Sequence, residues 1–181
     1  MRNNKVKQLC ETGIFAALVF LGVFIFKIPM PLGYTHLGDS LIFLAVLMIG
    51  GKRGAAAGAI GAGLADLAAG YAIWILPTAL CKGALALAMG FVIEKHLFGL
   101  KGKAAWIVGG VIGGIVQSLG YLCFWGLLFG KAAAASAVVG LIMQSSFGIA
   151  VAFAIAAALE KTTLRKYFVH MQLGTKGLEN D

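Results

Sequence analysis

Charged residues are scarce in this sequence, and their scarcity limits the kinds of protein that it can encode. Only 12% of the 181 residues are charged, whereas 60% are hydrophobic, and the chain contains 26 glycines and three prolines. A soluble domain of this length would need far more polar residues to cover its surface. The composition therefore predicts an integral membrane protein.

Several motifs and clusters are also absent. The three cysteines lie in different apolar segments without the spacing of a metal site or a disulfide, which favours buried small side chains. The sequence has no Walker A motif, nucleophile elbow, H-E-x-x-H motif or paired carboxylates, so no catalytic residue, metal or cofactor is predicted. Although the net charge is +8, the basic residues are neither clustered nor interleaved with aromatic residues, which argues against a nucleic-acid partner.

The apolar runs are long enough to cross a lipid bilayer. A transmembrane helix needs about 20 mostly apolar residues, and roughly six such segments fit in this chain. We therefore predict one domain, residues 1–181, with an all-α fold of six transmembrane helices and a tail at 162–181. The expected spans are 8–27, 38–50, 54–72, 74–94, 104–129 and 137–159. The second span is short, so it should lie in thinned membrane or be lengthened by ordered residues of the preceding loop.

The basic residues indicate the orientation of the spans. Twelve of the 15 Lys and Arg residues precede the first span, follow the last one or lie in every second connection, whereas only Lys27 and Lys131 lie on the opposite side. Connections on the cytoplasmic side carry the excess of Lys and Arg in membrane proteins. Both termini and the tail are therefore predicted to be cytoplasmic.

Several polar side chains interrupt the apolar spans at similar depth, in the half of the membrane away from the cytoplasm. They are Asp66, Lys82, Gln117, Tyr121 and Gln144. Near the membrane centre a charge costs on the order of 2.5–3.5 kcal/mol, so charged residues there face the bundle interior and are usually functional. An aromatic-lined pocket for a small, flat, polar organic ligand is predicted from these residues together with Trp74, Thr78 and Trp125.

Structural roles remain open for the same residues. Asp66 and Lys82 could form an ion pair that only stabilises the bundle. Gln117 and Gln144 could hydrogen-bond between helices, and the aromatic residues could mark the membrane interface. However, purely structural groups should be spread over both halves of the membrane, so their joint placement in one half favours a binding site.

The longest exterior connection precedes the second span and contains His36 and Asp39. Asp39 could cap the following helix by accepting hydrogen bonds from free backbone N–H groups. His36 has no companion His or Cys at ligand spacing, so no metal site is predicted there. Instead, the connection is expected to close over the pocket, and both residues are candidates for substrate binding.

Small residues spaced four apart suggest faces on which helices approach closely. In the first span they are Gly13 and Ala17, next to Ala16, and in the third span they are Gly58 and Ala62. These faces could pack within the chain or bind another membrane subunit.

A series of short motifs carries a family resemblance. The block His36–Leu44 reads HLGDSLIFL and is followed by GGKRG at 50–54, GAGLADL at 61–67, GYAIW at 70–74 and Lys82-Gly83. In this order the motifs resemble the substrate-binding S components of energy-coupling factor (ECF) vitamin transporters. Residues 34–92 carry most of the resemblance, and the six-span plan extends it over almost the whole chain.

The resemblance implies a division of labour between subunits. An S component binds a vitamin or vitamin precursor from outside with high affinity, while an ECF transmembrane coupling subunit and two ATPases supply motion and energy. The chain would then be a multi-pass protein of the bacterial plasma membrane and not an enzyme. Family members often carry an A-x-x-x-A motif in the first span that docks the coupling subunit, and the nearest match here is Gly13–Ala17.

The identity of the ligand is left open by the sequence. A heteroaromatic vitamin such as hydroxymethylpyrimidine or a pyridoxine-like compound is favoured, and riboflavin, pantothenate and folate remain candidates. Two other functions are also considered: a stand-alone secondary transporter in which Asp66 relays protons, and a membrane scaffold that only binds partners.

Overall fold

Six α-helices and a short β-hairpin make up the described part of the chain. The computed structural model describes residues 2–30 and 33–163, so the predicted tail lies outside the described residues from residue 164 onward. In chain order the elements are α1 (Arg2–Phe24), β1 (Lys27–Met30), β2 (Gly33–His36), α2 (Gly38–Ile49), α3 (Gly51–Ala68), η1 (Ala72–Trp74), α4 (Ile75–Glu94), η2 (Leu97–Gly99), α5 (Gly102–Phe129) and α6 (Lys131–Glu160).

The six predicted helical segments are thus present as six helices. Within the described residues, four segments are long and apolar enough to cross a membrane, namely Asn4–Phe24, Ala72–Glu94, Gly102–Phe129 and Lys131–Glu160. Large apolar side chains on their outer faces are exposed, including Leu9, Leu87 and Ile115. An apolar outer surface on helices of this length is what a lipid environment requires.

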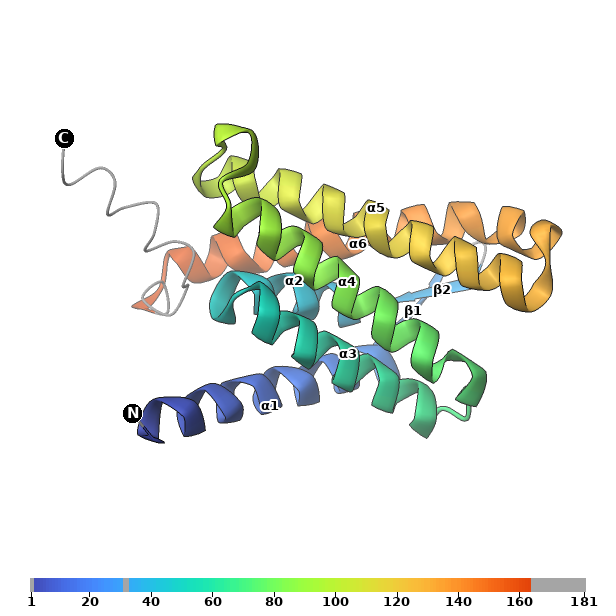
Figure 1. Cartoon of the computed structure of the whole chain (residues 1–181), viewed down its shortest axis with the longest axis horizontal. Coiled ribbons are helices and arrows are strands. Elements are labelled where there is room, and N and C mark those ends of the chain that lie inside the picture. Colours follow the sequence, from blue (N-terminus) through green and yellow to red (C-terminus); the bar gives the residue numbers. More distant parts are fainter. Residues whose placement is uncertain (1, 31–32, 164–181) are drawn as a thin grey trace.

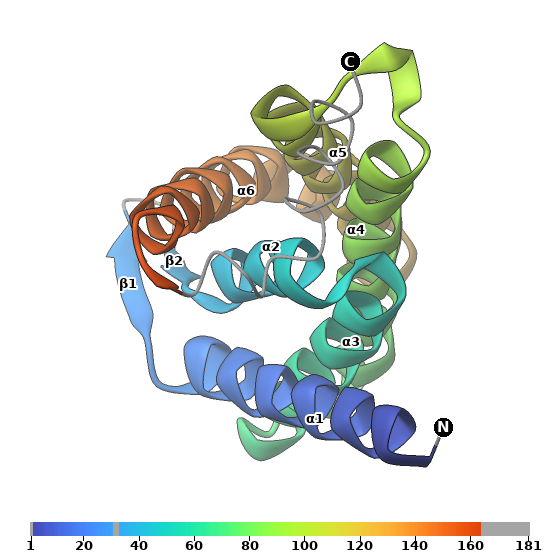
Figure 2. The same ribbon diagram turned by 90° about the vertical axis from the view of Figure 1, so that its left-hand side faces the viewer.

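The short helix α2 lies at the centre of the bundle. It has 12 residues, about 18 Å of helix, and packs against α1, α3, α4 and α6. Ten of its residues are buried, and Phe43 and Leu47 are fully enclosed. Figure 2 shows α2 surrounded by the longer helices. This helix is too short to cross a bilayer alone. Its first residues lie inside the bundle, whereas the longer helices around it extend further toward the end with the hairpin (Figure 1).

The connection before α2 is an antiparallel hairpin, which the all-α prediction did not include. Lys27 pairs with His36 and Met30 pairs with Gly33, and β2 lies against α6. Thinned membrane or ordered residues of the preceding loop were expected before the short second helix, without strands. The hairpin instead satisfies its backbone groups by strand pairing, which lets an extended segment reach down to the start of α2.

Glycines allow close contacts where α2, α3 and α1 meet. Gly50 joins α2 directly to α3 and has φ of 90°, a conformation that side chains disfavour. At Gly61 a side chain would overlap the backbone oxygen of Ala16 and approach the Cβ of Val19 to 2.9 Å. The Gly/Ala composition of α3 therefore brings its backbone against that of α1.

The two ends of the bundle differ in their connections. The N-terminus, the α2–α3 and α4–α5 connections and the end of α6 gather at one end, on the left in Figure 1. The hairpin, η1 and the α5–α6 turn gather at the other end. The polar residues that interrupt the helices lie toward this second end.

Candidate functional site

A cavity of about 390 Å³ opens at the end of the bundle that holds the hairpin and η1. Its lining comes from β2, the α3–η1 connection, η1 and four α-helices, α3, α4, α5 and α6. The described residues that line it are His36, Asp66, Tyr71, Trp74, Thr78, Tyr121, Trp125, Ala137, Gly140, Leu141 and Gln144. This volume lies in the range of about 300–1,000 Å³ that is typical of small-molecule sites.

Aromatic rings form one wall of the cavity. The ring of Trp74, on η1, lies 5.0 Å from that of Trp125 and 6.1 Å from that of Tyr121, measured between centroids. Phe129 extends the cluster, at 5.9 Å from Trp74 and 5.2 Å from Trp125. Tyr121 and Trp125 are four residues apart on α5, so they share one helical face. A wall of this kind offers flat apolar surfaces to a ring-shaped ligand.

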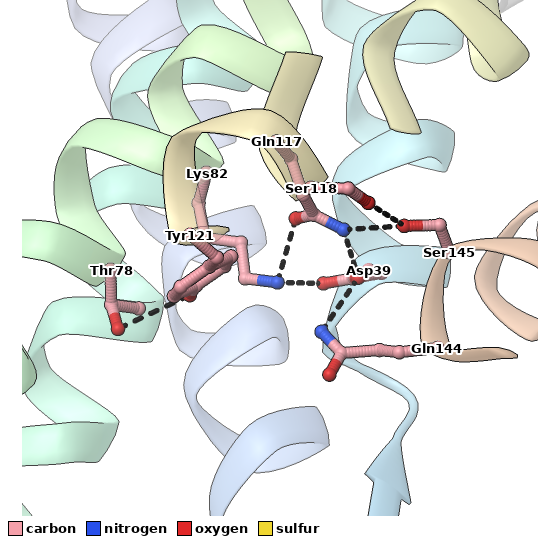
Figure 3. Close-up of polar contacts among 8 residues, drawn as sticks. All are labelled: Asp39, Thr78, Lys82, Gln117, Ser118, Tyr121, Gln144 and Ser145. Atoms are coloured by element: carbon pink, nitrogen blue, oxygen red, sulfur yellow. Dashed lines mark hydrogen bonds and ion pairs between the residues drawn. The ribbon is translucent and has the colours of Figure 1, made fainter. Parts of the chain in front are cut away.

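A buried polar network lies beside this cavity (Figure 3). The Lys82 Nζ lies 2.5 Å from the Asp39 Oδ1 and donates a hydrogen bond to the Gln117 Oε1 at 2.8 Å. The Gln117 Nε2 in turn donates to the Asp39 Oδ2 at 2.8 Å and to the Ser145 Oγ at 3.0 Å. Lys82, Asp39 and Gln117 are all at most 1% exposed. The network therefore joins α2, α4, α5 and α6 out of contact with solvent.

Two residues connect this network to the cavity. Gln144 lines the cavity, and its Nε2 donates to the Asp39 Oδ2 at 3.0 Å. Tyr121 places its ring 5.2 Å from the Lys82 Nζ, while its hydroxyl donates to the Thr78 Oγ1 at 3.2 Å. A displacement of the network side chains can thus move the cavity wall through Gln144 or through Tyr121.

The ion partner of Lys82 differs from the one considered from the sequence. The structural pairing proposed there was with Asp66, but Lys82 pairs with Asp39, and Asp66 lines the cavity instead. The short helix explains the difference, because α2 begins inside the bundle and thereby places Asp39 at the depth of Lys82. Asp39 also does not serve as the helix cap considered from the sequence: α2 begins after Leu37 without a side-chain cap bond, and the Asp39 carboxylate accepts hydrogen bonds from three side chains instead.

The eight predicted binding residues separate into two groups. Five of them line the cavity, namely His36, Asp66, Trp74, Tyr121 and Gln144, and the other three, Asp39, Lys82 and Gln117, belong to the buried network. Lys82 is therefore beside the cavity rather than part of its described lining.

The prediction missed several lining residues. They are Tyr71, Ala137, Gly140 and Leu141. Tyr71 precedes the predicted Trp74 by three residues, and the other three precede Gln144 by seven, four and three residues. Positions spaced in this way share one face of a helix, so the spacing from Gln144 was the available signal.

The predicted partner-binding residues also separate by location. On α1, Gly13 and Ala17 are exposed and Ala16 is partly buried. Gly58 and Ala62, on α3, are buried, and a side chain at Gly58 would lie 3.1 Å from Ile42. The small residues of α3 thus pack within the chain, whereas Gly13 and Ala17 remain available on the surface.

Comparison with known proteins assigns the family. Residues 3–161 match the family described as the ECF-type riboflavin transporter, S component. The chain belongs to this S-component family. It is also 32% identical to a Pyrococcus woesei protein, described as an uncharacterized protein in a gap 3' region, over 137 residues that cover 75% of this chain and 89% of that protein. The resemblance to ECF S components is therefore confirmed, and the chain is a transporter component of a membrane-protein family rather than an enzyme.

Proposed function

We propose that this S component is the high-affinity binding subunit of an ATP-driven importer for a small heteroaromatic vitamin or vitamin precursor. The observation that carries the proposal is the cavity of about 390 Å³ with an aromatic wall and several polar groups. Trp74, Tyr121 and Trp125 can stack on a flat ring, while Asp66, His36 and Gln144 can hydrogen-bond to its substituents. The family supports a vitamin as the ligand class.

The charges around the cavity favour some vitamins over others. No Lys or Arg is among the described lining residues, and the nearby Lys82 is already paired with Asp39. An anionic ligand would therefore lose its hydration without gaining a cationic partner from the described lining, which is costly in a low-dielectric site. Hydroxymethylpyrimidine, pyridoxine-like compounds and riboflavin, the vitamin in the family description, fit this condition better than pantothenate or folate, which carry carboxylates.

The proposed topology places both termini in the cytoplasm and the cavity at the exterior end, with six membrane crossings. Basic residues support this orientation. Outside the network, the described Lys and Arg residues lie mainly at the end opposite the cavity, namely Arg2, Lys5, Lys7, Lys52, Arg53, Lys95, Lys101, Lys103 and Lys161. Such an excess is typical of the cytoplasmic side. We propose that the protein is a multi-pass protein of the bacterial plasma membrane.

Transport is proposed to need an ECF transmembrane coupling subunit and two ATPases. The exposed surface of α1 around Gly13 and Ala17 is the proposed docking face, because small side chains let a partner helix approach closely. The α3 residues Gly58 and Ala62 are left out of this face, since they are occupied by contacts within the chain.

Mass spectrometry of small molecules released from the gently purified chain tests the ligand assignment. We expect a heteroaromatic vitamin or precursor in near-stoichiometric amount, and its loss from a Trp74→Ala variant. A released pantothenate or folate would contradict the charge argument. A chain that neither releases nor is stabilised by any vitamin would favour a scaffold, and uptake by proteoliposomes without ATPases would favour a secondary transporter.

A further inference from the structure

Two glutamine side chains lie on the same carboxylate in the buried network. Gln117 and Gln144 each donate from Nε2 to the Asp39 Oδ2, at 2.8 Å and 3.0 Å. The other oxygen of Asp39 lies on the Lys82 ammonium. An ionised carboxylate can only accept hydrogen bonds, and an ammonium can only donate them. The ion pair therefore dictates which end of each neighbouring amide can face it.

For Gln117 this rule explains the positions of both polar atoms of the amide, Nε2 and Oε1. Its Nε2 faces the two acceptors, Asp39 and Ser145, and its Oε1 faces the Lys82 Nζ at 2.8 Å. Turning the amide over would bring oxygen against carboxylate and nitrogen against ammonium. The orientation of this amide is thus fixed by charge, and its bonds are all directed within the network.

For Gln144 the same rule leaves the Oε1 and one N–H of the amide without a bond to the network. With its Nε2 committed to Asp39, the Oε1 points away from the carboxylate, as Figure 3 shows. Gln144 is partly buried and lines the cavity, whereas Asp39 is fully buried. The Asp39–Lys82 pair therefore holds the Gln144 amide with its Oε1, and the second N–H of its Nε2, on the side away from the carboxylate.

We propose that Gln144 sets the hydrogen-bonding polarity of the cavity: the substrate must present an N–H or O–H donor at the Gln144 Oε1. Asp39 is the positioning residue that enforces this polarity. The inference rests on the proposed use of the cavity for a ligand and adds a requirement on the substituents of the ring. A hydroxyl or amino group suits this position, whereas a ring nitrogen with a lone pair, a carbonyl or an ether oxygen does not, because two acceptors would then face each other.

A matched pair of fragments tests this requirement independently of the identity of the vitamin. 4-(Hydroxymethyl)pyridine carries an O–H donor, and 4-(methoxymethyl)pyridine replaces it by an ether. Their dissociation constants are measured on the purified full chain by ligand-observed NMR at millimolar concentration. One neutral hydrogen bond corresponds to about a threefold to tenfold difference in affinity, so the wild type should bind the alcohol tighter by about that factor.

Variants show whether Gln144 is responsible for the difference. Gln144→Met keeps the length of the side chain without its polar atoms and should bind the two fragments about equally. Gln8→Met, on the exposed surface of α1, is the matched control and should behave as the wild type.

The outcomes separate this inference from the proposed function. Equal affinities in the wild type, an undiminished preference in Gln144→Met, or no binding of either fragment would overturn the assignment of Gln144. If the preference depends on Gln144 but the purified chain binds no vitamin, the inference stands and the proposed transport function fails.

Discussion

Replacing Lys82 by methionine should destabilise the folded protein more than it weakens ligand binding. The side chain is 1% exposed and forms an ion pair with Asp39, which is itself fully buried. Methionine has a similar length but leaves the carboxylate inside the bundle without its ion partner. Breaking a buried ion pair from one side costs about 3–5 kcal/mol.

The expected size of the effect can be converted to a melting temperature. For a chain of 150–250 residues, 1 kcal/mol corresponds to roughly 2–4 °C, so Lys82→Met should lower the midpoint by roughly 6–20 °C. The measurement is thermal unfolding of the detergent-purified protein, followed by the reactivity of the buried Cys81 thiol. Leu87→Met, on the exposed outer face of the same helix, is the matched control and should change the midpoint little.

A double variant distinguishes the loss of the ion pair from the burial of a single unpaired charge. Lys82→Met combined with Asp39→Leu removes both charges, and replacing a whole buried pair by apolar residues is often neutral or stabilising. The double variant should therefore be more stable than Lys82→Met alone, although Gln117 and Gln144 lose an acceptor. An unchanged midpoint together with at least a tenfold loss of vitamin affinity in Lys82→Met would refute this account and make Lys82 a ligand-binding residue.

Three further predictions concern topology, docking and the hairpin. A cysteine at Lys101 should be inaccessible to an impermeant thiol reagent in intact cells, and exterior labelling would invert the proposed orientation. Ala17→Trp, on the exposed face of α1, should block transport and spare vitamin binding. Gly61→Leu should disturb the packing of α1 on α3 and reduce both transport and vitamin binding. If Ala17→Trp also reduces transport and binding equally, the α1 surface is not a docking face. Bound vitamin should protect residues 28–39 from proteolysis more than residues 130–136, and equal protection would show that the hairpin is not a lid.

The helices could be predicted from the sequence because apolar runs report directly on burial in lipid. The predicted spans overlap all six helices, but α6 begins at Lys131, six residues before the predicted start, because its first turns are rich in alanine and have no clear polar boundary. The hairpin was missed because its strands have only four residues each and β1 includes a proline, so they carry little signal.

The site was predictable in its composition but not in its pairings. Depth along each helix indicated that Lys82, Gln117 and Gln144 would lie close together, and hydrogen bonds to one carboxylate join them. Depth could not identify Asp39 as that carboxylate, because the depth of Asp39 in the bundle depends on where the hairpin places the first residue of α2. This is a tertiary effect that no local pattern records.

Filling the aromatic-lined cavity with a bulky side chain tests whether a vitamin binds there. Gly140 lines it, and a Cβ atom added there meets no atom within 4 Å, so phenylalanine can be attached at this position without a clash at the backbone. Gly13 is equally unobstructed but lies on α1, which makes Gly13→Phe the control. Equilibrium binding of riboflavin, pyridoxine and hydroxymethylpyrimidine is measured on the purified chain and both variants. One of these three vitamins or precursors should bind the wild type and Gly13→Phe with equal affinity and should not bind Gly140→Phe. Equal binding by all three proteins would contradict a vitamin site in this cavity.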